Sequence, residues 1–206
     1  MAPVLLELRR RSNAVRSLVC ATGQHRQMLD QAFRLFDITP DLDLAVMQPD
    51  QTLAELSARL IGALDRTVRD LQPDWILAQG ETTSVLAAAL VAFYHRVRFG
   101  HIEAGLRTGD LMRPFPEEMN RRVADLLATR YFAPTERARQ TLLGEGVPAS
   151  RIVLSGNTVV DALQIISTQP FELAASPLAG IDLRRVVLVS AHRRESFGAP
   201  FRDLCT

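Results

Sequence analysis

The stretch VRFGHIEAGLRTGDLMRPFPEEMNRR, residues 97–122, decides the fold. Its first residues are mostly apolar and predict a buried strand over 97–103. A polar segment with two glycines follows, and PEEMNRR then opens a helical pattern, because proline suits the first turn of a helix. The stretch therefore predicts a strand, a loop rich in charged side chains and a helix, in that order.

The same order recurs along the chain. Apolar runs predict further strands at 15–22, 75–80, 130–134, 151–156 and 184–191. Helical patterns lie between them at 24–36, 52–71, 82–96, 116–129 and 135–146. Strands that alternate with helices of this length indicate βαβ units, and continuous apolar strands fit a sheet covered on both faces. We therefore expect an α/β fold with a doubly wound parallel sheet.

Polar clusters stand at the ends of several predicted strands. GQHRQ follows 15–22, GETTS follows 75–80, and the polar segment of the opening stretch follows 97–103. In a doubly wound sheet the ligand crevice lies at the carboxyl ends of the strands. The free N–H groups of helix N-termini there favour anions, so we expect a phosphorylated ligand.

Composition excludes several classes of function. The formal net charge is +1, with 47% hydrophobic and 23% charged residues, which describes a globular protein without the basic surface of a nucleic-acid or membrane binder. No apolar run reaches the roughly 20 residues that span a bilayer, and MAPVLLELRRRS has the reverse charge order of a signal peptide. Cys20 and Cys205 form no metal or disulfide pattern. The expected location is the cytoplasm.

The two ends of the chain suggest incomplete units. MAPVLLELRRR is typical of most of a helix, so the chain is expected to begin inside a β–α unit. Residues 168–183 are rich in Pro, Ala and Ser and predict a linker. We expect one domain over 1–167 that lacks its first strand, a linker over 168–183, and the beginning of a second domain over 184–206.

The opening stretch also has a purely structural interpretation. Glu117 and Arg121 are four residues apart, as are Glu118 and Arg122. On a helix surface such pairs contribute only about 0.3–0.5 kcal/mol each. Glu103, at the end of the preceding strand, favours a site instead, because it would lie in the same crevice.

Other short motifs also have both a structural and a functional interpretation. Glu81 complements a helix N-terminus, and His25 is either a site residue or simply the start of a helix. Asn157 or Thr158 is expected to cap the helix after RIVLSG. HRR, residues 192–194, follows a predicted strand and favours an anion site over a solvated run of charge.

Taken in order, these motifs resemble the UDP-N-acetylglucosamine 2-epimerases of the non-hydrolysing bacterial type. The matching stretches are GQHRQMLDQ, HIEAGLRTGD, PFPEEMNRR, RIVLSGNTVVDAL and AHRRESFG. The resemblance implies a Rossmann-like N-terminal domain of a two-domain architecture similar to glycosyltransferase-B, with only the start of the second domain present. It further implies a homodimer when complete, and no metal or other cofactor.

The implied reaction interconverts UDP-N-acetylglucosamine and UDP-N-acetylmannosamine. UDP is eliminated across C1–C2 to give 2-acetamidoglucal, and it is then added back with the proton on the other face, which requires positioned acids and bases. The implied catalytic residues are Glu81, Glu103, Glu117, Arg121 and His192. The residues implied for substrate or a second, activating nucleotide sugar are Gln24, His25, Gln27 and Arg193.

Two departures from the family pattern bear on activity. The family typically has Asp where this chain has Glu81, and a carboxylate moved by roughly 1 Å can cost ~100-fold in rate. A segment of the form GTRPEAIK, which contacts phosphate, is expected just before MAP, so the chain alone is expected to be inactive. Two alternatives remain: a hydrolysing epimerase, which PEEMNRR and AHRRESFG disfavour, and a non-catalytic remnant that binds nucleotide sugars.

Overall fold

The computed structural model describes residues 1–23, 26–176, 178–182, 184 and 186–187. The chain divides into two compact units, residues 1–168 and 169–206. The expected strand at 184–191, and with it His192 and Arg193, falls largely or wholly outside the described residues, as do Gln24 and His25. In the second unit the described residues include one short 3-10 helix, η2 (Leu173–Ala175).

The first unit carries two parallel sheets. One has four strands in the order β3 (Trp75–Gln79), β4 (Arg98–Ile102), β5 (Arg130–Ala133) and β6 (Ile152–Leu154). The other pairs β1 (Cys20–Ala21) with β2 (Leu42–Asp43). The expected parallel α/β fold is confirmed. The strand expected over 15–22 is reduced to two residues, and β2 was not expected at all.

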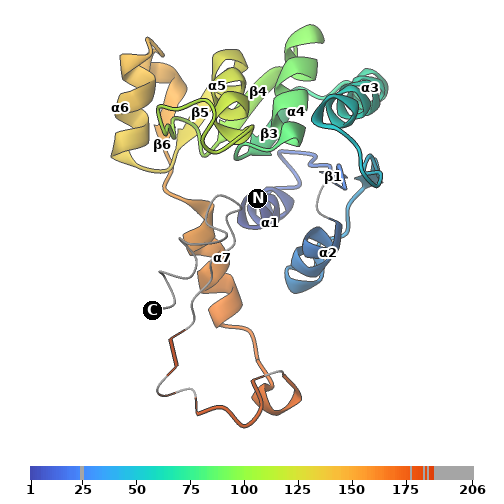
Figure 1. The fold of residues 1–206 in the computed structure, drawn as a ribbon, viewed down its shortest axis with the longest axis vertical. Helices are drawn as coiled ribbons and strands as arrows, with labels where there is room; N and C mark the ends of the chain where they lie inside the picture. Colours follow the sequence, from blue (N-terminus) through green and yellow to red (C-terminus); the bar gives the residue numbers. More distant parts are fainter. Residues whose placement is uncertain (24–25, 177, 183, 185, 188–206) are drawn as a thin grey trace. The chain divides into compact units, whose positions relative to one another are not determined.

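The described residues form seven α-helices, of which α2–α6 connect the strands while α1 precedes β1 and α7 follows β6. Figure 1 shows α3–α6 in the upper part of the view and α1, α2 and α7 below. The helices are α1 (Ala2–Arg10), α2 (Arg26–Leu35), α3 (Leu53–Leu71), α4 (Thr83–Tyr94), α5 (Glu117–Leu127), α6 (Glu136–Gly144) and α7 (Thr158–Ser167), with a 3-10 turn η1 (Ala149–Arg151) before β6. All the predicted helices are present, with ends moved by a few residues.

Local signals explain where the long helices begin. Thr52 accepts a hydrogen bond from the Glu55 backbone N–H, and the Glu55 side chain accepts one from Thr52 N–H, which is a complete capping box for α3. Thr82 and Thr135 cap α4 and α6 in the simpler way. α4 is apolar almost all round and packs between α3 and α5, as expected for a helix buried against the sheet.

The core lies around α4 and the four-stranded sheet. Leu60 of α3, Val91 of α4, Phe99 of β4 and Leu142 of α6 are almost completely buried there. Gly100 in β4 fits this packing closely, because a Cβ at that position would lie 2.5 Å from Leu77 Cδ2 and would force that side chain to shift. The core thereby fixes the sheet whose carboxyl ends carry the polar turns.

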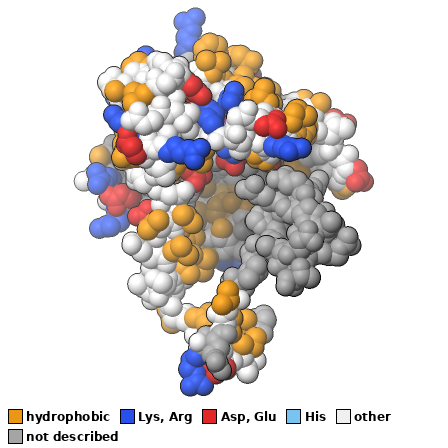
Figure 2. Space-filling view, turned by 60° about the vertical axis from the view of Figure 1, so that its left-hand side comes forward, with side chains coloured by type: hydrophobic (Ala, Val, Ile, Leu, Met, Phe, Trp, Pro, Cys, Tyr) orange, Lys and Arg blue, Asp and Glu red, His pale blue; other side chains and the backbone are white. Residues whose placement is uncertain are grey.

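The surface mixes both signs of charge. Every cation that Figure 2 colours blue is arginine, because the chain contains no lysine. Basic and acidic side chains alternate over the upper part of that view rather than forming a single-sign patch. Within the described ranges, no helix combines the length and the apolar character needed to cross a bilayer.

Candidate active site

Two tight turns at the carboxyl ends of β3 and β4 form the floor of the candidate site. Gly80 follows β3 with φ +83°, and Glu103 follows β4 with φ +68°, a conformation that is uncommon for a residue with a side chain. The Gly80 N–H donates to the Ile102 carbonyl at 3.0 Å, which joins the two turns. A Cβ on Gly80 would lie 3.7 Å from Glu103 Oε2, so this carboxylate lies against the β3 turn.

Glu81 occupies the β3 turn and faces α5. Its Oε1 lies 3.1 Å from the Arg121 guanidinium, and its backbone carbonyl accepts a hydrogen bond from Asn120 Nδ2 at 2.9 Å. Asn120 is buried, so this bond links the turn to the side of α5 that faces the sheet. The turn and the helix therefore hold each other in place through two adjacent residues of α5.

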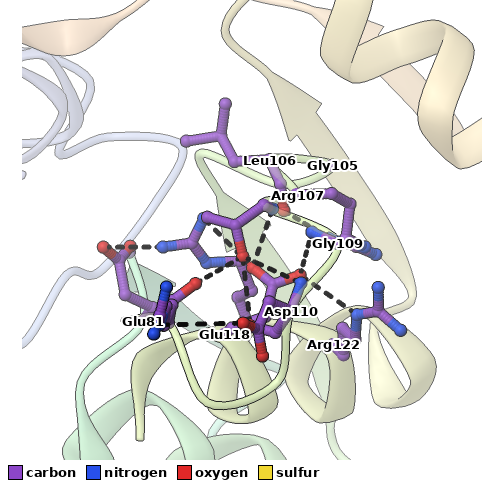
Figure 3. A network of polar contacts seen from close by, with 12 residues as sticks. Glu81, Gly105, Leu106, Arg107, Gly109, Asp110, Glu118 and Arg122 are labelled. Carbon is purple, nitrogen blue, oxygen red and sulfur yellow. Dashed lines mark hydrogen bonds and ion pairs between the residues drawn. The ribbon is translucent and has the colours of Figure 1, made fainter. Parts of the chain in front are cut away.

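The carboxylate at the centre of the network is Glu118, which lies in the first turn of α5 and is completely buried. It accepts hydrogen bonds from the backbone N–H groups of Thr108 (3.1 Å) and Gly109 (3.4 Å), and from Arg122 Nε (3.2 Å). Arg121 lies 3.5 Å away. Figure 3 shows Glu81, Glu118 and Arg122 gathered beside the loop that carries Arg107 and Gly109.

These partners decide the ionisation of Glu118. Burial by itself raises the pKa of a carboxyl group, but the hydrogen bonds from Thr108, Arg122 and Gly109 outweigh it and hold the pKa of Glu118 below its ordinary value. The surface ion-pair interpretation of this helix is wrong for Glu118 and Arg121, because both are buried. Arg121 pairs with Glu81 and Glu118, and among the described residues no Glu117–Arg121 pair forms.

Arg121 keeps one hydrogen-bond donor free. Its Nε is buried and has no acceptor among the described residues, although the rest of the guanidinium is paired. A buried donor without a partner is unfavourable, so a ligand acceptor at this atom would be stabilised. Arg121 also lines a pocket of about 300 Å³. The residues around that pocket are Gly105, Leu106, Arg107, Arg121, Thr135, Arg137, Ala138 and Thr141.

Glu103 has a partner from a distant part of the chain. Asn157 Nδ2 donates to Glu103 Oε1 at 2.9 Å, while Asn157 Oδ1 accepts from the Val159 N–H at 2.9 Å and so caps α7. Asn157 rather than Thr158 is the cap, which settles that choice. The contact with Glu103 was not expected, because the two residues are 54 positions apart in the sequence and no local pattern indicates the contact.

Of the remaining predicted site residues, the structure describes some and not others. Glu117 begins α5, is partly buried and has no hydrogen-bond or ion-pair partner among the described residues. The backbone of Gln27 lies in the first turn of α2. His192, Arg193, Gln24 and His25 lie outside the described residues. In the part of the chain that the structure describes, no three His, Cys, Asp or Glu side chains are grouped as metal ligands.

The fold and the contacts of Arg121 first define a class of protein. It is an open parallel α/β protein in which two carboxylates, Glu81 and Glu118, contact one guanidinium beside the carboxyl ends of the strands. The comparisons with known proteins then give the family. Residues 7–206 match the family model described as UDP-N-acetylglucosamine 2-epimerase. The chain belongs to that family.

Relatives of known sequence and structure agree. A UDP-N-acetylglucosamine 2-epimerase of Yersinia pestis is 47% identical over 213 residues, covering 100% of this chain and 56% of the relative. The structure of a Listeria monocytogenes protein, provisionally described as the same enzyme, matches with a TM-score of 0.89 at 40% identity, over 98% of this chain and 53% of that one. The UDP-GlcNAc 2-epimerase of Neisseria meningitidis bound to UDP-GlcNAc matches with a TM-score of 0.77 at 48% identity, over 80% and 44%. The chain thus spans about half the length of the relatives it matches.

Proposed function

We propose that this chain supplies the catalytic domain of a UDP-N-acetylglucosamine 2-epimerase, which interconverts UDP-N-acetylglucosamine and UDP-N-acetylmannosamine. The observation that carries the proposal is Arg121, held between Glu81 and Glu118 with a free Nε donor, beside the turn of Glu103. Membership of the family and the likeness to a relative bound to UDP-GlcNAc support the choice of substrate.

The chemistry proposed for these residues is the movement of one proton. A base removes the proton from C2 of the sugar, the electron pair forms the C1–C2 double bond, and the C1–O bond to UDP breaks. UDP then adds back to C1 while an acid delivers a proton to the other face of C2. Glu103 and Glu117 are the proposed acid and base, since two positioned carboxyl groups serve both directions of the reaction. Arg121 is proposed to hold negative charge that develops next to them.

The test uses a joined enzyme, in which this chain replaces the matching 56% of the Yersinia pestis relative. Incubated with UDP-N-acetylglucosamine in D₂O, it should form UDP-N-acetylmannosamine that carries deuterium at C2. Glu103→Gln and Glu117→Gln should each abolish most of this turnover. Chelators should leave it unchanged, and Glu81→Asp should leave it equal or higher.

Three outcomes would contradict the proposed function, and each would indicate a different conclusion. Release of free N-acetylmannosamine together with UDP would indicate a hydrolysing epimerase. Tight binding of the nucleotide sugar without turnover would indicate a binding protein. Product without deuterium at C2 would exclude proton exchange at that carbon and with it the roles given to Glu103 and Glu117.

A further inference from the structure

A second polar centre lies under the two turns, and the proposed chemistry does not use it. His101 in β4 is completely buried, and each of its ring nitrogens faces an oxygen. Nδ1 lies 2.6 Å from Asp125 Oδ1 of α5, and Nε2 lies 2.8 Å from the Gly80 carbonyl oxygen. His101 therefore bridges β3 and α5 from the strand between them.

The hydrogen-bond partners determine where the protons are. A carbonyl oxygen only accepts, so Nε2 carries a hydrogen. Asp125 Oδ2 accepts from the Gly105 N–H at 3.0 Å and pairs with Arg107 at 2.8 Å, so both of its neighbours are donors. An ionised carboxylate also only accepts, so Nδ1 carries a hydrogen as well.

Positive and negative side chains alternate in the row of contacts that begins at His101. Protonated His101 faces Asp125, Asp125 faces Arg107, and Arg107 pairs in turn with Glu145 at 2.6 Å, which gives two positive and two negative groups. From β5, Tyr131 lies beside His101 in register, and burial together with the charge of Asp125 raises the pKa of its hydroxyl, so it stays neutral. Such an alternating row is how a fold retains buried charge.

The two bonds of His101 act on the backbone that carries the candidate catalytic residues. The Gly80 carbonyl belongs to the peptide unit that leads into Glu81. Asp125, oriented by His101, holds the N–H of Gly105, two residues after Glu103. We propose that His101 is a doubly protonated positioning residue that fixes both turns, with the catalytic consequence resting on the function proposed above.

The protonation state is tested without any assay of turnover. The protein is labelled with ¹⁵N-histidine, and spectra are recorded near neutral pH on the 206-residue chain and on the joined enzyme, with the His101 signals assigned by their loss in His101→Asn. Both ring nitrogens of His101 should carry hydrogen. A ring nitrogen of His101 without hydrogen would overturn the proposal, whatever the activity of the joined enzyme.

The positioning role is tested by a matched pair of variants. The shorter amide in His101→Asn still reaches Asp125 but not Gly80, so it should lower kcat of the joined enzyme roughly 10–100-fold with a much smaller change in KM. His95 is the control: its Nε2 also pairs with a carboxylate, Asp65 Oδ1 at 2.7 Å, but it follows the C-terminal end of α4, away from the turns. His95→Asn should leave both constants unchanged.

The possible results separate the two proposals. An unchanged kcat in His101→Asn would reject the positioning role, as would an equal fall in kcat for His95→Asn. If the joined enzyme with His101 intact has no turnover, the proposed function fails, while the ¹⁵N spectra still decide whether His101 is doubly protonated.

Discussion

The four-stranded sheet and the two-stranded sheet of residues 1–168 are built in different ways. Around β3–β6 the chain buries most of its core, together with all six buried polar or charged residues of the described part: Thr83, His101, Glu118, Asn120, Arg121 and Asp125. Around β1 and β2 it buries much less, and the side-chain bonds to the backbone there are exposed, such as those from Val19 N–H to Asp41 and from Ala45 N–H to Asp43.

This difference shows where a chain of this kind can support precise geometry. Buried polar groups are stable only when partners surround them, and the four-stranded side supplies partners from the turn after β3, the loop after β4 and α5. Among the described residues β1 pairs only with β2 and β3 only with β4, so the two sheets meet through side chains, as in the 2.9 Å contact between Thr22 and Ser84. The candidate residues Glu81, Glu103 and Arg121 all belong to the better-supported side.

The largest effect is expected from the buried carboxylate on that side. Glu118→Gln removes the charge that faces Arg121 and Arg122 while keeping the shape, and breaking a buried pair in this way costs about 3–5 kcal/mol. The adjacent Glu117→Gln should change the free energy of unfolding by less than about 0.5 kcal/mol, because its carboxylate has no partner among the described residues. Urea denaturation of both variants measures this contrast, and equal losses would contradict it.

The loss of stability at low pH should also depend on the carboxylate of Glu118. The pKa of Glu118 is lower in the folded protein than its ordinary value of 4.5, so its contribution is complete above that value and is lost as the pH falls through the folded pKa. Stability measured from pH 7 downward should therefore fall less steeply in Glu118→Gln. If stability falls equally steeply with decreasing pH in the variant and the original protein, carboxylates other than Glu118 govern the loss of stability in acid.

Two glycines of the active-site loop give the next contrast. Gly105 and Gly109 both have positive φ, but a Cβ on Gly105 would lie 2.3 Å from the Ala138 carbonyl oxygen, whereas a Cβ on Gly109 meets nothing within 4 Å. Gly105→Ala should cost about 2–5 kcal/mol from overpacking and strain together, and Gly109→Ala about 1–2 kcal/mol from strain alone. Thermal unfolding of the pair separates packing from backbone strain.

Hydrogen exchange compares the two sheets directly. Amides of β4, which is paired on both sides, should open with a free energy close to that of global unfolding. Amides of β1 and β2 should exchange at least about tenfold faster, a difference of ~1.4 kcal/mol. Equal protection in the two sheets would show that they unfold as one unit.

The smallest effect is expected in α3, the helix between β2 and β3. Thr52→Ala removes the capping box and should cost about 1 kcal/mol, while Thr52→Ser keeps the hydroxyl and should be close to neutral. Chemical denaturation measures both variants. A loss much larger than that of an ordinary cap would indicate that the start of α3 also holds the two sheets together.

Sequence reasoning recovered what local patterns encode. The runs at 75–80, 97–103 and 130–134 became β3, β4 and β5, because apolar strands and capped helices follow from short-range preferences. β2 was missed because two residues, Leu42 and Asp43, form no pattern. Its pairing depends on β1, which lies more than 20 residues earlier.

The sequence also singles out candidate site residues. Glu81, Glu103, Glu117 and Arg121 were singled out from the sequence, and the structure adds the contact between Glu81 and Arg121. The structural interpretation of the helix places Glu118 on its surface, whereas the structure buries it, and the predicted strand correctly contains His101 but does not indicate its partners. The sequence could not predict these partners for one reason: whether a polar side chain is buried depends on groups such as Gly109, Asp125 and Gly80, which the fold brings together from separate elements.

The amide of Asn157 has a consequence for which residues evolution or design can place there. Asp, Ser and Thr serve as well as Asn at most helix starts, yet here the oxygen of the amide caps α7 and its nitrogen holds Glu103. Asp would keep the cap but set a second negative charge against Glu103, and Ser or Thr is too short to serve both sides. A position that looks interchangeable among four amino acids is thereby restricted to one.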